Sequence, residues 1–86
     1  MWQDLVGKTF VSYPSGKPDT TAETFVFKEE PEGRFSTNGS TSGKNVYNVD
    51  GKRLVHVEYG EKVVATLEDA EFVWSHGYRS RPYEEV

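Results

Sequence analysis

Apolar and polar residues alternate along most of this chain, which is the pattern of β-strands rather than of helices. Thr, Phe and Val dominate residues 21–28, where Phe25 and Phe27 fall on one face. Turn-forming residues separate such segments at regular intervals. The expected strands are 8–13, 21–28, 34–37, 44–49, 52–59, 62–67 and 71–76. We therefore predict an all-β protein, an antiparallel up-and-down meander of six or seven strands that forms a small barrel or sandwich.

The two ends of the chain depart from this alternation. Trp2, Leu5 and Val6 lie on one face of a short N-terminal helical turn, and Gly7 is a natural end for it. We expect this turn to plug one end of a barrel. Residues 78–86 alternate in charge, and we expect them either to pair briefly or to remain a flexible tail of the single β domain 1–86.

Three turn sequences rich in Asp, Glu or Gly set the strand register in the second half of the chain. The loops are expected at residues 50–51, at 60–61 and at either 68–69 or 69–70. A two-residue loop fixes which residues of a hairpin face each other. The first loop pairs Tyr47 with Leu54, and the second pairs His56 with Ala65.

These registers divide the second half of the chain between two faces of the sheet. The face with most of the large apolar side chains should be the core, and it consists of Tyr47, Val49, Leu54, His56, Glu58, Val63, Ala65, Leu67, Phe72, Trp74 and His76. The opposite face carries an apolar strip, here called the valine strip: Val55, Val57, Tyr59, Val64 and Val73. A lone subunit would leave this strip exposed, so we predict a homodimer formed through it.

His56, Glu58 and His76 form a polar cluster on the predicted core face. One interpretation is that they ring the mouth of the barrel, solvated and hydrogen-bonded to one another. A second is a ligand-binding site, which uses Phe25, Phe27, His56, Glu58, Trp74 and His76. A third is an enzyme, because two imidazoles and a carboxylate suit a transition metal or acid–base catalysis. We assign no catalytic residue and no metal ligand.

Composition narrows the range of functions. The chain has no cysteine, which excludes disulfides and thiolate metal sites. Its net charge is −4 and its ten basic residues are scattered, which argues against nucleic-acid binding. The sequence shows neither a signal peptide nor a membrane-spanning segment, so we expect a soluble, cytoplasmic protein without a membrane partner. The Gly-rich segment 39–43 reads as a flexible loop without the features of a phosphate-binding loop, and we expect no cofactor.

The order of these features resembles small lipocalin-like barrels of the calycin type. The matching segments are LVGKTF, FVFKEEPEGRF, SGKNVYNVDGKRLVHVEYGEKVVATL and EFVWSHGYRSR. Gly7-Lys8-Thr9 stands where that family has Gly-x-Trp, and the chain is shorter than a full lipocalin. The resemblance implies an up-and-down barrel that binds a small apolar or amphipathic ligand without catalysis. The alternative is a protein-interaction or inhibitor module that acts through the outer apolar face or a sheet edge.

Overall fold

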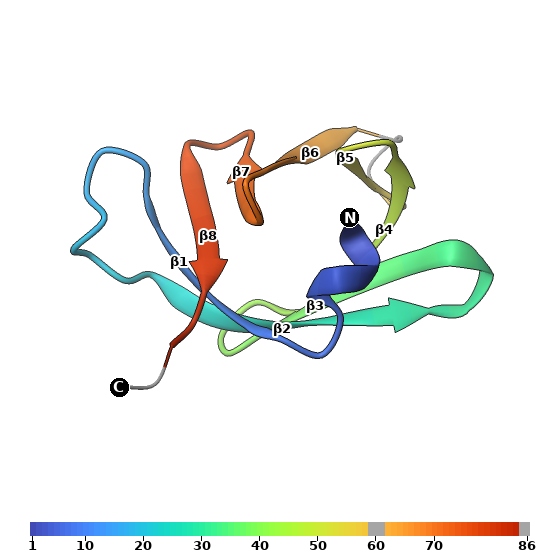
Figure 1. Ribbon diagram of the computed structural model, residues 1–86, viewed down its shortest axis with the longest axis horizontal. Coiled ribbons are helices and arrows are strands. Elements are labelled where there is room, and N and C mark those ends of the chain that lie inside the picture. The colour runs from blue at the N-terminus through green and yellow to red at the C-terminus, as the bar shows by residue number, and fades with distance from the viewer. Residues whose placement is uncertain (59–61, 85–86) are drawn as a thin grey trace.

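In the part of the chain that the structure describes, eight antiparallel strands form a closed barrel, each paired with its neighbours in sequence order (Figure 1). The computed structural model describes residues 1–58 and 62–84. The strands are β1 Thr9–Pro14, β2 Glu23–Glu30, β3 Arg34–Gly39, β4 Gly43–Asp50, β5 Arg53–His56, β6 Val63–Glu68, β7 Glu71–Trp74 and β8 Tyr78–Pro82, with two 3-10 turns, η1 Trp2–Leu5 and η2 Pro31–Gly33. The all-β meander is confirmed, and the expected number of six or seven strands is corrected to eight.

Aromatic side chains that point inward from the strands form most of the core. Its buried members are Trp2, Leu5, Phe10, Phe25, Phe27, Phe35, Tyr47, Leu54, Ala65, Leu67 and Phe72. Phe72 is at the centre and has no exposed surface. Five aromatic rings surround it with centroid distances of 4.9–5.6 Å: Trp2, Phe10, Phe25, Phe27 and Trp74. Large rings give this short chain the buried area that its low apolar content would otherwise deny it.

The N-terminal turn η1 closes one end of the barrel, as the sequence predicts. Trp2 and Leu5 are both buried, and the Trp2 indole N–H donates to the Gly51 carbonyl oxygen at 2.7 Å. The Gly7 N–H donates to the Phe27 carbonyl oxygen, with Gly7 at φ +84°, where the chain turns from η1 into β1. The plug is therefore tied to the β4–β5 turn and to β2 at the same end of the barrel.

The turn between β4 and β5 pairs the strands two residues away from the expected register. Asp50 pairs with Arg53, so Tyr47 faces His56 and not Leu54. The loop is therefore Gly51–Lys52, with Gly51 at φ +60°. This arrangement spares Asp50 the positive φ that a type I′ loop at 50–51 requires. A shift of two residues leaves every side chain on its predicted face.

An irregularity between Leu54 and Val55 changes the pairing of β5 with β6. Leu54 pairs with Ala65 and Val55 with Val63, so the expected pairing of His56 with Ala65 is wrong. Val63, expected in the core, is 40% exposed. A bulge of this kind rotates the residues beyond it out of the regular alternation. The expected loop at 60–61 lies outside the described residues.

The β6–β7 hairpin agrees with one of the two expected loops. Glu68 pairs with Glu71, which makes Asp69–Ala70 the loop. Asp69 and Ala70 have φ values of +49° and +63°, as a type I′ turn needs at both central positions. Leu67 and Phe72 consequently face each other inside the barrel.

The final strand β8 closes the barrel, since it pairs with both β7 and β1. Ser80 lies opposite Ser12 of β1, and the two hydroxyl oxygens are 2.7 Å apart in the interior. The Tyr83 N–H continues the pairing by donating to the Thr9 carbonyl oxygen. The segment 78–86, expected to pair briefly or form a tail, thus supplies a complete strand in its first half. Among the described residues, no helix has the length and apolar character needed to cross a membrane.

Candidate ligand-binding pocket

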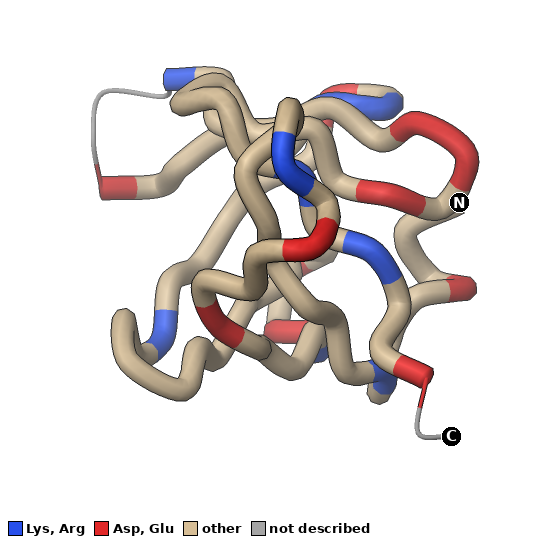
Figure 2. Tube along the Cα trace, turned by 90° about the vertical axis from the view of Figure 1, so that its left-hand side faces the viewer, with Lys and Arg blue, Asp and Glu red and all other residues tan. Residues whose placement is uncertain are grey.

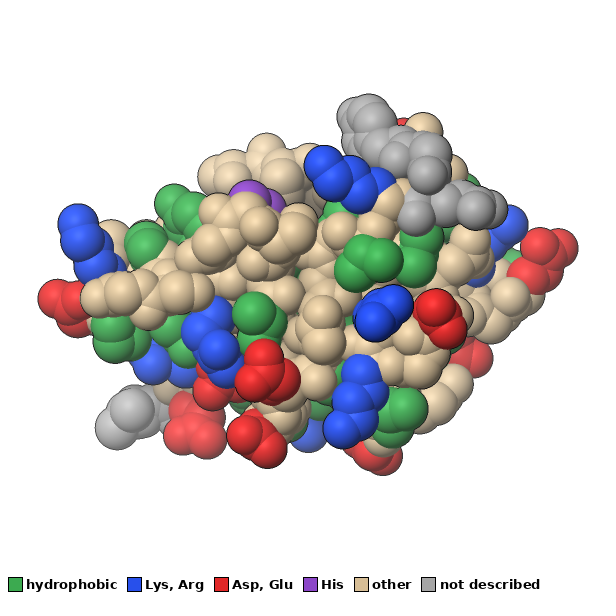
Figure 3. Space-filling view, turned by 90° about the horizontal axis from the view of Figure 1, so that it is seen from above, with side chains coloured by type: hydrophobic (Ala, Val, Ile, Leu, Met, Phe, Trp, Pro, Cys, Tyr) green, Lys and Arg blue, Asp and Glu red, His purple; other side chains and the backbone are tan. Residues whose placement is uncertain are grey.

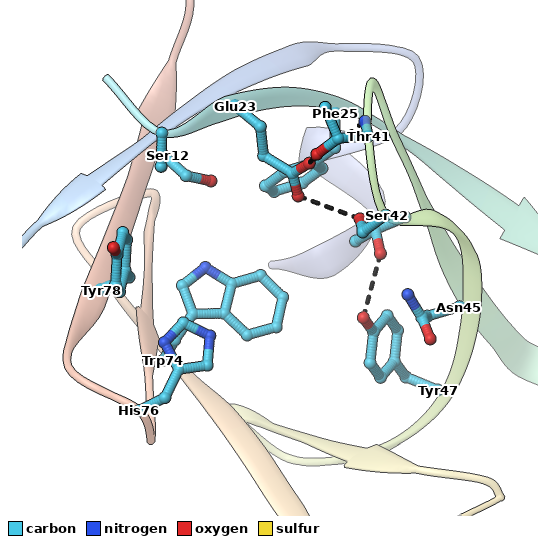
Figure 4. Close-up of a pocket in the computed structure, with 12 residues that line it drawn as sticks. Ser12, Glu23, Phe25, Thr41, Ser42, Asn45, Tyr47, Trp74, His76 and Tyr78 are labelled. Atoms are coloured by element: carbon cyan, nitrogen blue, oxygen red, sulfur yellow. Dashed lines mark hydrogen bonds between the residues drawn. The ribbon is translucent and has the colours of Figure 1, made fainter. Parts of the chain in front are cut away.

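A pocket of about 390 Å³ opens at the end of the barrel opposite η1. Because successive strands run in opposite directions, the fully described turns at this end are 15–22, 40–42 and 75–77. The lining residues are Ser12, Ala22, Glu23, Phe25, Thr37, Thr41, Ser42, Asn45, Tyr47, Trp74, His76 and Tyr78 (Figure 4). Aromatic rings and polar groups both contribute, which is the usual composition of a small-molecule site.

The floor of the pocket is aromatic. The Trp74 ring meets Phe25 edge-on at 6.0 Å and lies 6.3 Å from Tyr47. His76 stacks on the outer side of Trp74 at 5.9 Å with an interplanar angle of 4°. The Tyr47 hydroxyl shares a hydrogen bond of 3.0 Å with Thr37 Oγ1, and burial raises the pKa of Tyr47. The phenol therefore remains protonated at neutral pH and presents a neutral polar group to the cavity.

Two buried serines hold Trp74 in place. The indole N–H donates to Ser80 Oγ at 2.7 Å, and Ser80 Oγ lies 2.7 Å from Ser12 Oγ. An indole nitrogen can only donate, so Ser80 accepts from it and shares a hydrogen with Ser12. This network fixes the ring orientation and uses the one polar hydrogen of Trp74. No buried side-chain nitrogen or oxygen in the described part of the chain lacks a partner.

Glu23 at the start of β2 is the one carboxylate among the lining residues that the structure describes. Its Oε2 accepts from the backbone N–H and the hydroxyl of Thr41, and its Oε1 accepts from Ser42 Oγ at 3.0 Å. These bonds lower the pKa of Glu23, the Thr41 hydroxyl being the largest cause and burial opposing it. The side chain is therefore a carboxylate at neutral pH.

A close approach at Gly39 allows this arrangement. A side chain at Gly39 would collide with Ser42 Oγ and would come within 3.0 Å of Glu23 Oε1. The β3–β4 turn can fold over the carboxylate only because position 39 has no Cβ. The segment 39–43, expected from the sequence to be a flexible loop, thus contains the turn that orients Glu23.

Half of the six predicted ligand-binding residues line the pocket: Phe25, Trp74 and His76. Phe27 lies deeper, fully buried and stacked on Phe35 at 5.2 Å. His56 lies behind the wall, with its ring edge-on to Tyr47 at 5.5 Å. Glu58 is exposed, and only its backbone N–H reaches this region.

His56 has a structural arrangement in which both ring nitrogens are used. Its Nδ1 accepts from the Glu58 N–H at 3.2 Å, and its Nε2 lies 3.2 Å from Asn45 Oδ1. The proton therefore sits on Nε2, which donates to Asn45. Among residues 1–58 and 62–84, no three His, Asp or Glu side chains gather as a metal site would require, so His56, Glu58 and His76 do not converge as the enzyme interpretation needs.

The sequence interpretation missed Ser12, Glu23, Thr41 and Ser42. One signal for Glu23 was present in the alternation itself, because residues 23, 25 and 27 lie on the same face of one strand. A carboxylate on the inward face beside Phe25 indicates an interior end that is open and polar. Thr41 and Ser42 carried no comparable signal, since their position depends on how the turn folds over the barrel.

Comparisons of this chain with protein-family models, with curated proteins and with solved structures found no match. The eight-stranded antiparallel barrel agrees with the expected lipocalin-like form at the level of architecture. The observations that bear on function are therefore those of the pocket.

The described members of the valine strip lie on β5, β6 and β7 and, for Val57, directly after β5. Val55, Val57, Val64 and Val73 are half-buried, Val64 contacts the core, and Val63 joins the exposed side. Tyr59, the remaining member, lies outside the described residues. The view from above this side shows hydrophobic side chains in small groups with charged side chains between them (Figure 3).

The homodimer through the valine strip stays a prediction. Sedimentation equilibrium at micromolar concentration is expected to give twice the 9.8 kDa of one chain. Val55→Lys should shift the protein to monomer, because it places a charge in the apolar contact. Thr24→Lys, on the outer face of β2, is the control and should leave the mass unchanged. If the unmodified protein sediments with the mass of one chain, the valine strip does not form a dimer interface.

Proposed function

We propose that this barrel is a non-enzymatic binding module that holds one small amphipathic molecule in the pocket at its open end. The observation that carries the proposal is a cavity of about 390 Å³ with an aromatic floor and a polar rim. That volume lies within the usual range for small-molecule sites, roughly 300–1,000 Å³. The apolar part of a ligand would rest on Phe25, Tyr47 and Trp74, and its polar part would face Ser12, Glu23 and Asn45.

Further support comes from the rigidity of the pocket. Trp74 is fixed by the serine pair, and Tyr47 is fixed by Thr37. A preformed site loses little conformational freedom when a ligand binds. Interaction through a sheet edge has less support, because the described strands form a closed circuit and none is left as an edge.

A simple probe tests this proposal. 2-Phenylethanol has an apolar ring and one hydroxyl, and at about 0.3 kcal/mol per heavy atom it should bind with a Kd of roughly 10 mM. In a ¹H–¹⁵N correlation spectrum we expect saturable shifts of the Trp74 indole resonance and of residues on β2, β3 and β4 near the pocket. The Trp2 indole, which lies in the plug at the opposite end, should not move.

Blocking the mouth provides the control. Ala22 lines the pocket with an exposed side chain, so Ala22→Phe should cover the opening and abolish the shifts, whereas Ala22→Ser should retain them. Equal shifts of both indoles, or shifts that persist in Ala22→Phe, would mean that the probe binds elsewhere and would contradict the proposed site.

A further inference from the structure

The charge of the pocket indicates what kind of ligand it would take. We propose that the pocket selects an organic cation, a primary ammonium group on a small aromatic or apolar body, with Glu23 as its counter-ion. This inference rests on the proposed function of the pocket and adds the chemical class of the ligand.

In the described part of the chain, Glu23 has no cationic partner. Two other carboxylates near the barrel ends are paired: Glu30 with Lys44 at 3.1 Å and Glu71 with Arg79 at 3.3 Å. Within the described residues, no Lys or Arg nitrogen lies within 4.0 Å of Glu23, and none of the pocket-lining residues is Lys or Arg. Lysines and arginines are instead dispersed along the chain among the acidic residues (Figure 2).

The groups that donate to the Glu23 carboxylate are all neutral, so they leave its negative charge uncompensated. A carboxylate offers about four acceptor positions on its two oxygens. The hydrogen bonds from Thr41 and Ser42 use two on Oε2 and one on Oε1. The Ser42 backbone N–H also helps to lower the pKa of Glu23, so an ammonium group would share the carboxylate with these neutral donors and would gain mainly from its charge. Glu23 and Ser42 lie on one side of the pocket and His76 and Tyr78 on the other, with the Trp74 indole between them (Figure 4).

The remaining surface suits a cation better than an anion. The face of Tyr47 is electron-rich and attracts an ammonium group placed over it. The Trp74 ring is already stacked with Phe72 and with His76, so it contributes apolar surface to the pocket. An anion would meet the Glu23 carboxylate, and the indole N–H is not free to bind it because it already donates to Ser80. Among the described lining residues, His76 is the remaining non-phenolic titratable side chain, and it is exposed and stacked on Trp74.

Three probes of similar shape test the inference: 2-phenylethylamine, 2-phenylethanol and 3-phenylpropanoate. The amine is an ammonium ion at neutral pH, the alcohol is neutral and the acid is an anion. The Trp74 indole shift gives the Kd of each. We expect the ammonium probe to bind roughly tenfold more tightly than the alcohol, as for a partly buried charge-assisted hydrogen bond, and the anion to bind more weakly than both.

Glu23→Gln removes the charge while keeping an acceptor for Thr41 and Ser42. It should bring the affinity for the ammonium probe down to that for the alcohol and leave the alcohol unchanged. Glu30→Gln is the matched control, because Glu30 lies on the same strand, accepts from a serine hydroxyl and is outside the pocket. It changes the net charge equally and should retain the preference for the ammonium probe.

The outcomes separate this inference from the function it rests on. Equal binding of the amine and the alcohol in the unmodified protein would overturn the cation preference and leave the binding module intact. Tighter binding of the anion would overturn it too, and would point to His76 as the group that meets the ligand. If none of the three probes shifts the Trp74 indole, both the inference and the proposed function fail. The comparison of probes needs no variant, so it holds even if Glu23→Gln does not fold.

Discussion

A chain that ends at Gly77 is expected not to fold. Strand β8 pairs with β1 over five residue pairs, from Phe10–Pro82 to Pro14–Tyr78, and with β7 on its other side. At roughly 1 kcal/mol for each lost hydrogen bond, the loss approaches the whole stability of a small domain, about 5–15 kcal/mol. The spectrum should lose its chemical-shift dispersion, and urea should produce no cooperative transition.

Loss of β8 would also open the barrel, in addition to removing its hydrogen bonds. Without β8, strands β1 and β7 become open edges and the Trp74 indole loses Ser80, its acceptor. A chain that ends at Tyr83 is the matched control, since it keeps every described hydrogen bond of β8 and should unfold cooperatively. If the chain that ends at Gly77 still unfolded cooperatively with nearly full stability, β8 would be dispensable and the barrel would not depend on it.

The reason β8 was hard to predict lies in its inward residues. Tyr78, Ser80 and Pro82 face the interior side, and the flanking Arg79 and Arg81 face outward. An alternation of this kind contains no aliphatic residue, so it lacks the period-2 apolar signal that identified the other strands. What holds Ser80 inside is the hydroxyl of Ser12, sixty-eight positions away in sequence. A local pattern cannot show a partner at that distance.

The side of the sheet on which a residue lies could be predicted wherever side chains alternate regularly along the strand. A two-residue error in the β4–β5 register left Tyr47, Leu54 and His56 on the interior side, because side chains alternate with a period of two. The bulge near Val55 is different, since a single irregular pairing changes the parity of the residues beyond it. For this reason Val63 is exposed although the alternation predicts it in the core.

Inward residues change in character along the barrel, and this change creates the pocket. From the centre of the barrel to the open end, the sequence passes from Phe10 to Ser12 on β1 and from Phe35 to Thr37 on β3. On β2 it passes from Phe25 to Glu23. On these three strands, aromatic rings fill the centre of the barrel. The polar side chains nearer the open end leave space for the pocket. A short chain can have both a core and a cavity because each occupies a different end.

The replacement Phe72→Ala should remove most of the stability of the protein. Phe72 is fully buried and contacts five aromatic rings, among them Trp2 of the plug and Trp74 of the pocket floor. Truncation of a buried phenylalanine costs about 3–5 kcal/mol, because apolar burial is lost and a cavity remains. Against a total of about 5–15 kcal/mol, this leaves a protein near its unfolding threshold. The free energy of unfolding from urea titration measures the effect.

Val26→Ala on β2 is the control for the loss at Phe72. Val26 points outward, is half-buried and lies outside the valine strip, so its truncation should cost no more than about 1 kcal/mol. A second variant, Phe72→Leu, keeps an apolar side chain and should lose less than Phe72→Ala. Similar losses for Phe72→Ala and Val26→Ala would mean that position 72 does not face the interior. Because Phe72 stacks on Trp74 at 5.5 Å, that result would also remove the support beneath the pocket floor.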